Sequence, residues 1–374
     1  MKRINSESDI TAYLHSKGRR LGLPIAGNFE LTARCNFNCP MCYVHMTEAQ
    51  LKASGREELT AQQWLDIAKA AKNRGMIFAL LTGGEPLVRK DFFEIYDGMR
   101  EMGILISINS NGSMLQGKIL EKFLEAPPVR FNISLYGGSN ETYRNMCGIP
   151  AYDRVKESIC ALRQAGVDVS LNLSITPYNK EDLAQIYADA VELDVNVRAS
   201  SYMYPPVRLS DGQYGCSNRL SCEESAKYSV EWDKLRFTEE EFALRAENMA
   251  KKIQMEGDGC PMEEGEGVRC RAGSTSFWMT WDGIMTPCGM LTTPSVKPLE
   301  IGFDAAWEQI RAATAKIRTP SKCVSCDYKD ICGACAAVYF TETGKFDEVP
   351  EYVCRRAEEI VKATRTVYEE RKQK

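Results

Sequence analysis

Short apolar runs alternate with amphipathic stretches from about Asn28 to Tyr202. The apolar runs have the length and the β-branched content of buried strands, and the stretches between them have the spacing of helices. The predicted strands are NFELTA near residue 30, MIFALL (76–81), ILISIN (104–109), VRFNISL (129–135), DVSLNLSI (168–175) and VNVRASSY (195–202). Consecutive strand–helix units predict an α/β fold with a parallel sheet, and six units suit a partial (β/α)6 barrel better than a closed eightfold one.

The first predicted helix has clear boundaries. Thr60 and Gln63 have the spacing of a capping box at its start, and Gly75 is placed to end it. Apolar residues recur between these two signals at the spacing of one helix face. They are Trp64, Ile67 and Ala71.

Changes in pattern divide the chain into four predicted parts. An N-terminal extension (1–27) precedes the TIM-like partial barrel (28–205), and a bridging segment (206–257) follows it. The bridge joins a loop-like stretch, PPVRLSDGQYGCSNRLS, to one amphipathic helix within TEEEFALRAENMAKKIQM. The last part (258–374) holds eight of the fifteen cysteines and ends in a helix, so we expect bound metal to hold it together rather than an extended core.

Composition narrows the class of protein. Lys plus Arg is 47 and Asp plus Glu is 51, and this formal charge of −4 argues against a nucleic-acid partner. The N-terminus lacks an apolar signal core, and no run approaches the roughly 18 apolar residues of a membrane span, which predicts a soluble cytoplasmic protein. In a reducing compartment, fifteen cysteines indicate metal or redox chemistry rather than disulfides.

Three cysteines, Cys35, Cys39 and Cys42, follow the first predicted strand as C-x3-C-x2-C. Three thiolates can ligate three irons of a [4Fe–4S] cluster and leave the fourth iron open for a small molecule. The alternative is a structural zinc site completed by His45 or by a distant cysteine. The stretches TGGEP (82–86), NSNG (109–112) and SLYGG (134–138) follow the next three strands, so all four segments should meet at the carboxyl edge of the sheet.

The cysteine triplet together with GGEP resembles the radical S-adenosylmethionine (SAM) enzymes. The resemblance implies that Cys35, Cys39 and Cys42 bind the catalytic cluster and that the amino and carboxylate groups of SAM chelate its open iron. Reductive cleavage of SAM would then give a 5′-deoxyadenosyl radical that abstracts a hydrogen from the substrate.

The resemblance also implies a set of SAM contacts. Glu85 and the two glycines before it would contact the methionine amino group, and Asn111 and Ser134 would reach the ribose or the carboxylate. The residue before the last cysteine, commonly aromatic in the family, is Met41 here, so its backbone would contact the adenine. Ordinary turns and caps are the alternative for these residues. The implied contacts are Met41, Gly83, Gly84, Glu85, Asn111 and Ser134.

The C-terminal cysteines form two further motifs. Cys270 to Cys288 has the spacing C-x12-G-x4-C, and Cys323 to Cys335 has C-x2-C-x5-C-x2-C. This pattern resembles the SPASM extension of radical SAM proteins, which carries two auxiliary [4Fe–4S] clusters; a zinc ribbon is the alternative. The resemblance implies Cys260, Cys270, Cys288 and Cys335 as ligands of the first auxiliary cluster, and Cys323, Cys326, Cys332 and Cys354 as ligands of the second.

Two departures from the SPASM pattern concern these ligands. Only Gly333 and Ala334 separate Cys332 from Cys335, where the family usually has three residues, and Cys260 stands farther from Cys270 than in sulfatase-maturing members. Either departure could open a coordination position for substrate. Four cysteines remain, and we expect them to be buried small side chains or incidental thiols. They are Cys147, Cys160, Cys216 and Cys222.

SPASM proteins mostly modify peptides, so the leading hypothesis is a maturase that installs a thioether or carbon–carbon crosslink in a ribosomally synthesised peptide. A protein dehydrogenase resembling anaerobic sulfatase maturases is the alternative, although those have an Asp base where this chain has Gly289. A peptide epimerase and a non-catalytic electron-transfer protein are further alternatives. We expect flavodoxin or ferredoxin as electron donor. Because about 27 residues precede the first strand, we expect leader binding by a separate protein, by the bridge, or not at all.

Overall fold

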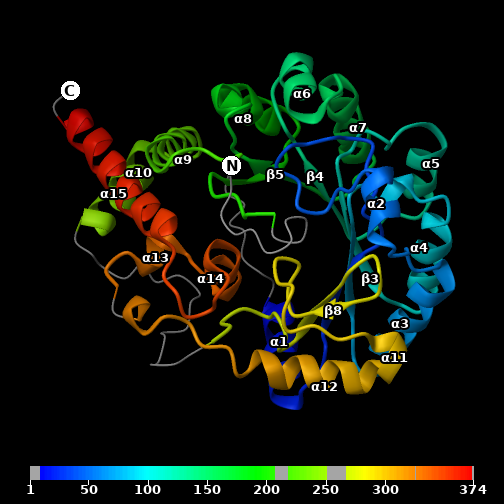
Figure 1. The fold of residues 1–374 in the computed structure, drawn as a ribbon. Helices are drawn as coiled ribbons and strands as arrows, with labels where there is room; N and C mark the ends of the chain where they lie inside the picture. The colour runs from blue at the N-terminus through cyan, green and yellow to red at the C-terminus, as the bar shows by residue number, and fades with distance from the viewer. Residues whose placement is uncertain (1–8, 207–217, 251–266, 325, 373–374) are drawn as a thin grey trace.

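The computed structural model describes residues 9–206, 218–250, 267–324 and 326–372 (Figure 1). One eight-stranded sheet lies at its centre, in the order β6-β5-β4-β3-β2-β1-β7-β8. The strands are β1 (Ala26–Glu30), β2 (Phe78–Thr82), β3 (Leu105–Ser110), β4 (Arg130–Ser134), β5 (Val169–Ser174), β6 (Asn196–Ser200), β7 (Ser276–Met279) and β8 (Met285–Thr286).

The first six strands confirm the predicted partial barrel. They are all parallel and neighbour one another in chain order, as consecutive strand–helix units require. The sheet then continues beyond the six predicted strands, because β7 pairs in parallel with β1 and β8 pairs antiparallel with β7. The C-terminal part of the chain therefore contributes two strands to the sheet of the barrel, directly beside the strand that leads into the cysteine triplet.

Six helices cover the outer face of the sheet (Figure 1). The capping box that begins α3 is present: Thr60 accepts from the N–H of Gln63, and the Gln63 side chain accepts from the N–H of Thr60 at 2.9 Å. The predicted apolar face of this helix, with Trp64, is buried. The helices are α3 (Ala61–Asn73), α4 (Phe92–Glu101), α5 (Gly117–Glu125), α6 (Asn140–Cys147), α7 (Tyr152–Gln164) and α8 (Leu183–Glu192).

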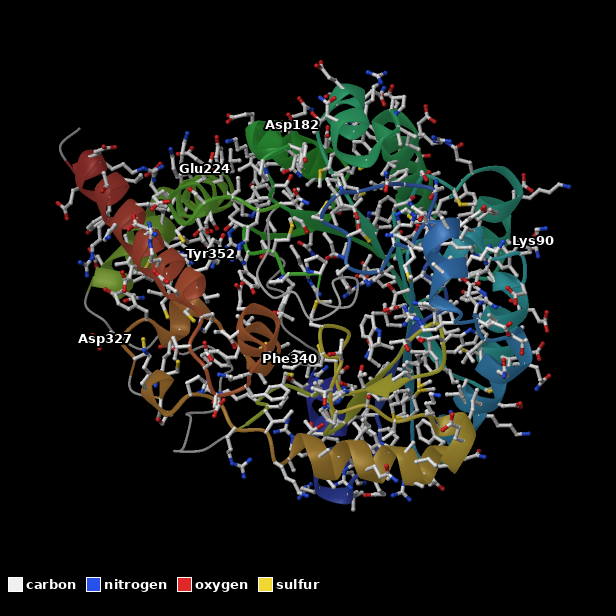
Figure 2. The ribbon with its side chains drawn as sticks, in the orientation of Figure 1. Lys90, Asp182, Glu224, Asp327, Phe340 and Tyr352 are labelled. Atoms are coloured by element: carbon white, nitrogen blue, oxygen red, sulfur yellow. The ribbon has the colours of Figure 1, made fainter. Side chains whose placement is uncertain are left out.

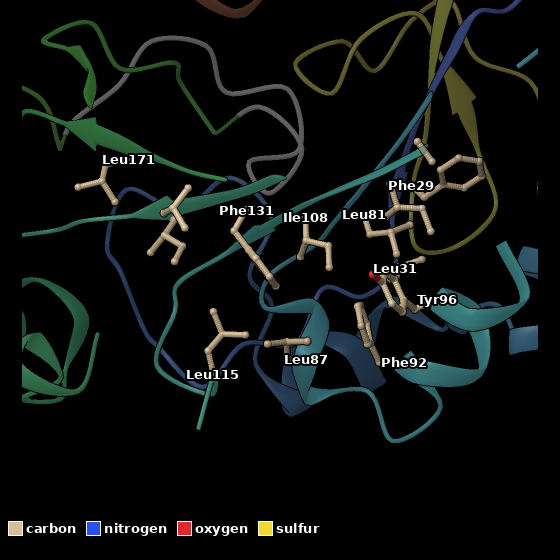
Figure 3. Packing of buried hydrophobic residues seen from close by; sticks show 14 of the residues in the cluster. Phe29, Leu31, Leu81, Leu87, Phe92, Tyr96, Ile108, Leu115, Phe131 and Leu171 are labelled. Atoms are coloured by element: carbon tan, nitrogen blue, oxygen red, sulfur yellow. The ribbon is translucent and has the colours of Figure 1, made fainter. Parts of the chain in front are cut away.

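The core lies between the sheet and these helices. Each of the first five strands places a large apolar side chain there with essentially no exposure, and aromatic residues of α4 pack beneath them (Figure 3). Burial of apolar area is the main favourable contribution to folding, so this continuous layer fixes the strands whose carboxyl ends carry the candidate site. The strand residues are Phe29, Leu81, Ile108, Phe131 and Leu171, and those of α4 are Phe92 and Tyr96.

The remaining helices gather in two places. Helices α9 (Cys222–Arg236), α10 (Glu239–Ala250) and α15 (Glu351–Lys372) pack together, while α12 (Phe303–Thr314) lies near α1 (Asp9–Leu21) and donates the Trp307 indole N–H to Gly22 O at 2.8 Å (Figure 1). The bridge was predicted to hold one helix; α10 is that helix, and α9 is additional.

The short helices are α2 (Glu48–Ser54), α11 (Pro298–Ile301), α13 (Lys329–Cys332) and α14 (Ala336–Thr343). Among the described helices, none combines the length and apolar character needed to cross a bilayer.

Candidate active site and cysteine groups

The cysteine triplet occupies the loop after β1, and backbone N–H groups point at its sulfurs. Cys35, Cys39 and Cys42 are half-buried. The N–H of Phe37 donates to Cys35 Sγ at 3.3 Å, and the N–H of His45 donates to Cys42 Sγ at 3.2 Å. Such donors stabilise sulfur in its thiolate form, which is the form that ligates iron. The loop therefore fits an iron–sulfur cluster.

The three thiols lie close enough to affect one another's ionisation. Burial raises the pKa of Cys35 to about 12, and nearby Glu85, Cys42 and Cys39 raise it further. A hydrogen bond to Cys147 is the main cause of a raised pKa at Cys39, followed by burial. Without a cationic partner Cys35 and Cys39 therefore favour the protonated form, and bound iron would supply the positive charge that releases their protons.

The glycine pair of GGEP lies against the cysteine loop. The N–H of Gly84 donates to Thr32 O at 2.8 Å, and the N–H of Glu85 donates to Arg34 O at 2.9 Å. A Cβ added at Gly84 would lie 2.3 Å from Arg34 O, and one at Gly83 would lie 2.6 Å from Thr32 O. The glycines thus permit a close backbone approach. In the structure, the partner in that approach is the chain itself.

Glu85 is fully buried and accepts hydrogen bonds from its own loop and from the end of β3 with the loop that follows it. Its carboxylate accepts from the N–H of Asn111 at 2.7 Å, from the N–H of Leu87 at 3.1 Å and from the Ser110 hydroxyl at 3.0 Å. Burial raises its pKa to about 7 in spite of these donors. Glu85 therefore ties the loop after β2 to the loop after β3. Its contact with SAM remains a prediction.

The other predicted SAM contacts lie at the same edge of the sheet. The Asn111 side-chain N–H donates to Asn36 Oδ1 at 2.8 Å and lies 3.8 Å from Cys35 Sγ, which links the loop after β3 to the triplet. Ser134 is half-buried at the end of β4, and Met41 is half-buried within the cysteine loop. The carboxyl ends of neighbouring parallel strands thus bring these residues together, as the sequence predicts.

A cavity of about 250 Å³ opens between the cysteine loop and the β7–β8 hairpin. The buried Glu30 accepts from the Trp278 indole N–H at 2.9 Å at one side of it. At the other side, the Arg56 guanidinium lies 4.7 Å from the centre of the Trp281 ring. Arg56 also pairs with Asp282 at 3.1 Å. The apolar residues that line the cavity are Val44, Met46, Trp281, Ile284 and Leu291.

Four C-terminal cysteines come together as one group. Burial raises the pKa of Cys332 to about 11, and the proximity of Cys354, Cys323 and Cys326 contributes to the rise. The N–H of Ala334 donates to Cys332 Sγ at 3.3 Å. These are the four cysteines that the SPASM resemblance implies for the second auxiliary cluster. Their donors and mutual proximity fit an anionic iron–sulfur centre.

Three more cysteines lie near the hydroxyl of Tyr204. The pKa of Tyr204 is raised, mainly because the residue is buried. Cys335, which is hydrogen-bonded to the Tyr204 hydroxyl, raises it further, and so do Cys288 and Cys270. The N–H of Met290 donates to Cys288 Sγ at 3.5 Å. The fourth cysteine implied for this cluster, Cys260, lies outside the described residues.

Cys332 and Cys335, the two cysteines of CGAC, belong to different cysteine groups. Helix α13 ends at Cys332, Gly333 follows in the left-handed region with φ of 59°, and α14 starts at Ala336. Glycine adopts this φ without strain, so the chain turns sharply and carries Cys335 toward Cys270.

All described cysteines are free thiols, and within the described ranges no three His, Cys, Asp or Glu side chains converge as a single metal ion requires.

Comparison with known proteins identifies the barrel. The model of the radical SAM superfamily matches residues 29–190, which span β1 to α8 and include the triplet and GGEP. Residues 29–190 therefore form a radical SAM domain. Enzymes of this superfamily use a [4Fe–4S] cluster and SAM, and the geometry of the Cys35 loop fits that cluster.

Relatives of this chain cover nearly its whole length. An AdoMet-dependent heme synthase from Methanosarcina barkeri is 27% identical over 344 residues, which are 88% of this chain and 95% of the relative. The structure of Streptococcus suis SuiB bound to its precursor peptide SuiA has a TM-score of 0.65 at 17% identity, covering 95% of this chain and 84% of SuiB. The structure of anSMEcpe with bound AdoMet and Kp18Cys peptide has a TM-score of 0.64 at 15% identity, covering 92% and 98%.

Some residues of the site carry no local signal in the sequence. Cys147 is buried as expected, but it also contacts Cys39, which is more than 100 residues away. Trp281 is buried and also lines the cavity. Among the other unassigned cysteines, Cys160 is half-buried on α7 and Cys222 is buried at the start of α9. Cys216 lies outside the described residues.

Proposed function

We propose that this protein is a radical SAM maturase that installs a thioether or carbon–carbon crosslink in a ribosomally synthesised peptide. The observation that carries the proposal is the position of the 250 Å³ cavity. Tyr43, next to Cys42, lines one side of it, while Thr286 and Leu291 on either side of Cys288 line the other. A substrate side chain in this cavity would lie between the SAM site and the first auxiliary site.

The proposed cofactors are SAM and three [4Fe–4S] clusters. The Cys35 triplet would hold the SAM-binding cluster, and the groups around Cys335 and Cys332 would hold two auxiliary clusters. Bound SAM would supply the radical that removes one hydrogen from the substrate. Closing a crosslink then releases a second proton and one electron, so a redox centre beside the cavity is required. Flavodoxin or ferredoxin is the proposed source of electrons for the cluster that binds SAM.

The lining of the cavity suits an amino-acid side chain. More of its lining surface is apolar than polar, and among its polar groups Arg56 pairs with Asp282. Its volume of about 250 Å³ is below the roughly 300 to 1,000 Å³ of ordinary small-molecule sites. A peptide that inserts one or two side chains and leaves its backbone outside would match this shape.

The fold comparisons support a peptide substrate. SuiB and anSMEcpe are both seen with peptides, and each shares the fold over more than nine-tenths of this chain. The alternative of a dehydrogenase is less well supported because Gly289 stands beside Cys288 where sulfatase maturases carry their base. A Cβ at Gly289 would lie 2.8 Å from the Trp278 ring, so the position has no room for such a side chain.

The heme synthase relative favours a second candidate, an AdoMet-dependent step of heme synthesis. Its similarity extends over 88% of this chain, farther than a shared barrel requires. A tetrapyrrole is, however, much larger than the 250 Å³ cavity, and we therefore place the peptide first.

The test is an anaerobic incubation of the iron-loaded enzyme with SAM, a reductant and the small peptides encoded beside its gene. The proposal expects a product that is two hydrogens lighter than its precursor. Loss of one alkylatable thiol would identify a thioether, and an intact thiol count would identify a carbon–carbon bond if fragmentation shows two residues joined. An unchanged mass would indicate an epimerase. Formation of heme from a porphyrin precursor, with every peptide unmodified, would establish the second candidate instead.

A further inference from the structure

A second cavity, of about 200 Å³, lies between the edge strand β6 and the helices α9 and α15. The two helices run side by side (Figure 1), with Glu224 on α9 and Tyr352 on α15 labelled in Figure 2. Unlike the proposed substrate cavity, this one is lined mainly by polar side chains. Three arginines, one aspartate, two serines and one indole contribute to its described lining.

Arg356 is the most buried of these arginines, with 8% of its surface exposed. Its guanidinium donates to Ser225 Oγ at 2.7 Å and to Ser201 Oγ at 2.9 Å, and both acceptors are neutral. No carboxylate in the described part of the chain lies within ion-pair distance of it. A buried cation of this kind is normally matched by an anion.

Trp232 provides a second, independent indication of a ligand. It is 4% exposed, and within the described residues its indole N–H has no hydrogen-bond partner. An indole nitrogen can only donate, and buried donors are nearly always satisfied. Its ring packs edge-on against Tyr187, with the ring centres 5.9 Å apart, and Trp232 lines the cavity.

The other two arginines share one carboxylate. Arg236 Nε donates to Asp233 Oδ1 at 2.9 Å, and Arg245 Nε lies 3.0 Å from Asp233 Oδ2. One aspartate cannot neutralise both of them and Arg356 as well, so the lining keeps a net positive charge. The cavity has the volume of several water molecules, which is enough for an oxyanion.

We propose that this cavity binds a small oxyanion, such as a phosphate or carboxylate group, on Arg356 and Trp232, with Arg236 and Arg245 completing the positive lining. Guanidinium groups present planar pairs of donors that match such anions. The proposal does not depend on which substrate the enzyme modifies. Its competitor is that Arg356 serves only to offset the charge of the cysteine group around Cys332, which is one of its electrostatic neighbours.

The test uses the full iron-loaded chain in a phosphate-free buffer, titrated calorimetrically with inorganic phosphate and, separately, with acetate. Saturable binding of one anion per chain is expected, and the stronger of the two identifies the preferred group. Trp232→Phe keeps the ring but removes the donor, so it should weaken binding about fivefold. Arg356→Lys keeps the charge but loses the paired donors, so it should weaken binding by at least about tenfold.

Arg130→Gln is the matched control, because Arg130, at the start of β4, forms a half-exposed ion pair with Asp168 and does not line the cavity. It should bind the anion as the wild type does. Absence of saturable binding for both anions would overturn the proposal, as would equal affinity in all variants. A change in the midpoint potential of the auxiliary cluster in Arg356→Lys, without anion binding to the wild type, would assign Arg356 to the cluster alone. Circular dichroism shows whether each variant has folded, and Trp232→Phe provides the test if Arg356→Lys does not.

Discussion

The carboxylate of Glu85 accepts a hydrogen bond of 2.7 Å from the backbone N–H of Asn111. Asn111 in turn contacts Asn36 and Cys35 in the cysteine loop. One buried carboxylate therefore joins GGEP to the loop after β3, and through it to the triplet. This gives Glu85 a structural role that exists before any SAM binds.

Glu85→Ala should destabilise the iron-free protein by about 1 to 3 kcal/mol, because it leaves buried donors of Asn111, Leu87 and Ser110 without their acceptor. Urea unfolding of the variant measures this loss. Glu94→Ala, at an exposed position on α4, is the control and should change stability little. A variant as stable as the wild type but with weaker SAM binding would show that Glu85 acts on the ligand alone.

The raised pKa of Glu85 predicts a dependence of stability on pH. Its folded pKa of about 7 exceeds the usual value of 4.5, so the folded state holds a proton that the unfolded state releases between these two values. The contribution of Glu85 is therefore fully present below about pH 4.5 and is lost as the pH rises through 7. Over this window the loss is on the order of 3 kcal/mol.

Unfolding of the iron-free protein at pH 5 and at pH 8 measures the effect, and Glu85→Gln provides the comparison. The variant has no proton to lose at this position, so its stability should fall less between the two pH values. Equal slopes for the two proteins would mean that Glu85 ionises as an ordinary surface carboxylate.

Iron content tests the three cysteine groups. If each group holds a cubane cluster, the reconstituted protein should bind roughly twelve irons, and replacing Cys35, Cys39 and Cys42 together by alanine should leave roughly eight. That variant should make no deoxyadenosine from SAM. Metal analysis by mass spectrometry measures both proteins. Tightly bound zinc in place of the C-terminal iron would contradict the assignment of auxiliary clusters.

Filling the substrate cavity should separate SAM cleavage from product formation. Ile284 lines the cavity opposite the cysteine loop and takes no part in the cysteine groups. Ile284→Trp should therefore block the peptide side chain, lowering product formation at least about tenfold, while deoxyadenosine is still released. Ile301→Trp, at a site 44% exposed, is the control. Normal peptide modification by Ile284→Trp would show that the peptide binds elsewhere.

The barrel was predictable from the sequence because each of its strands is a local apolar run bounded by turn signals, as at residues 76–81 before TGGEP. Strand β7 was not assigned to the barrel, since its pairing with β1 joins positions about 250 residues apart. Helix α9 was missed because its buried residues, among them Ser225, Tyr228 and Asp233, do not form an apolar stripe.

The candidate site, like the fold, has parts that the sequence predicts and parts that it does not. Closely spaced cysteines and GGEP are local motifs, so the triplet could be located from the sequence. The contact of Cys147 with Cys39 and the proximity of three cysteines to Tyr204 depend on tertiary packing, which the spacing of motifs does not predict. For Glu85 the sequence implied a ligand contact, whereas the hydrogen bonds in the structure reveal a second partner, the loop after β3.

The mass of the peptide product, compared between the wild type and Cys335→Ala, tests the central claim most directly. Cys335 belongs to the cysteine group beside Cys288, which flanks the cavity. We predict that the wild type gives a peptide that is two hydrogens lighter and has two residues joined, whereas Cys335→Ala still forms deoxyadenosine but leaves the peptide unmodified. A wild-type product of unchanged mass, or full crosslinking by Cys335→Ala, would contradict the account.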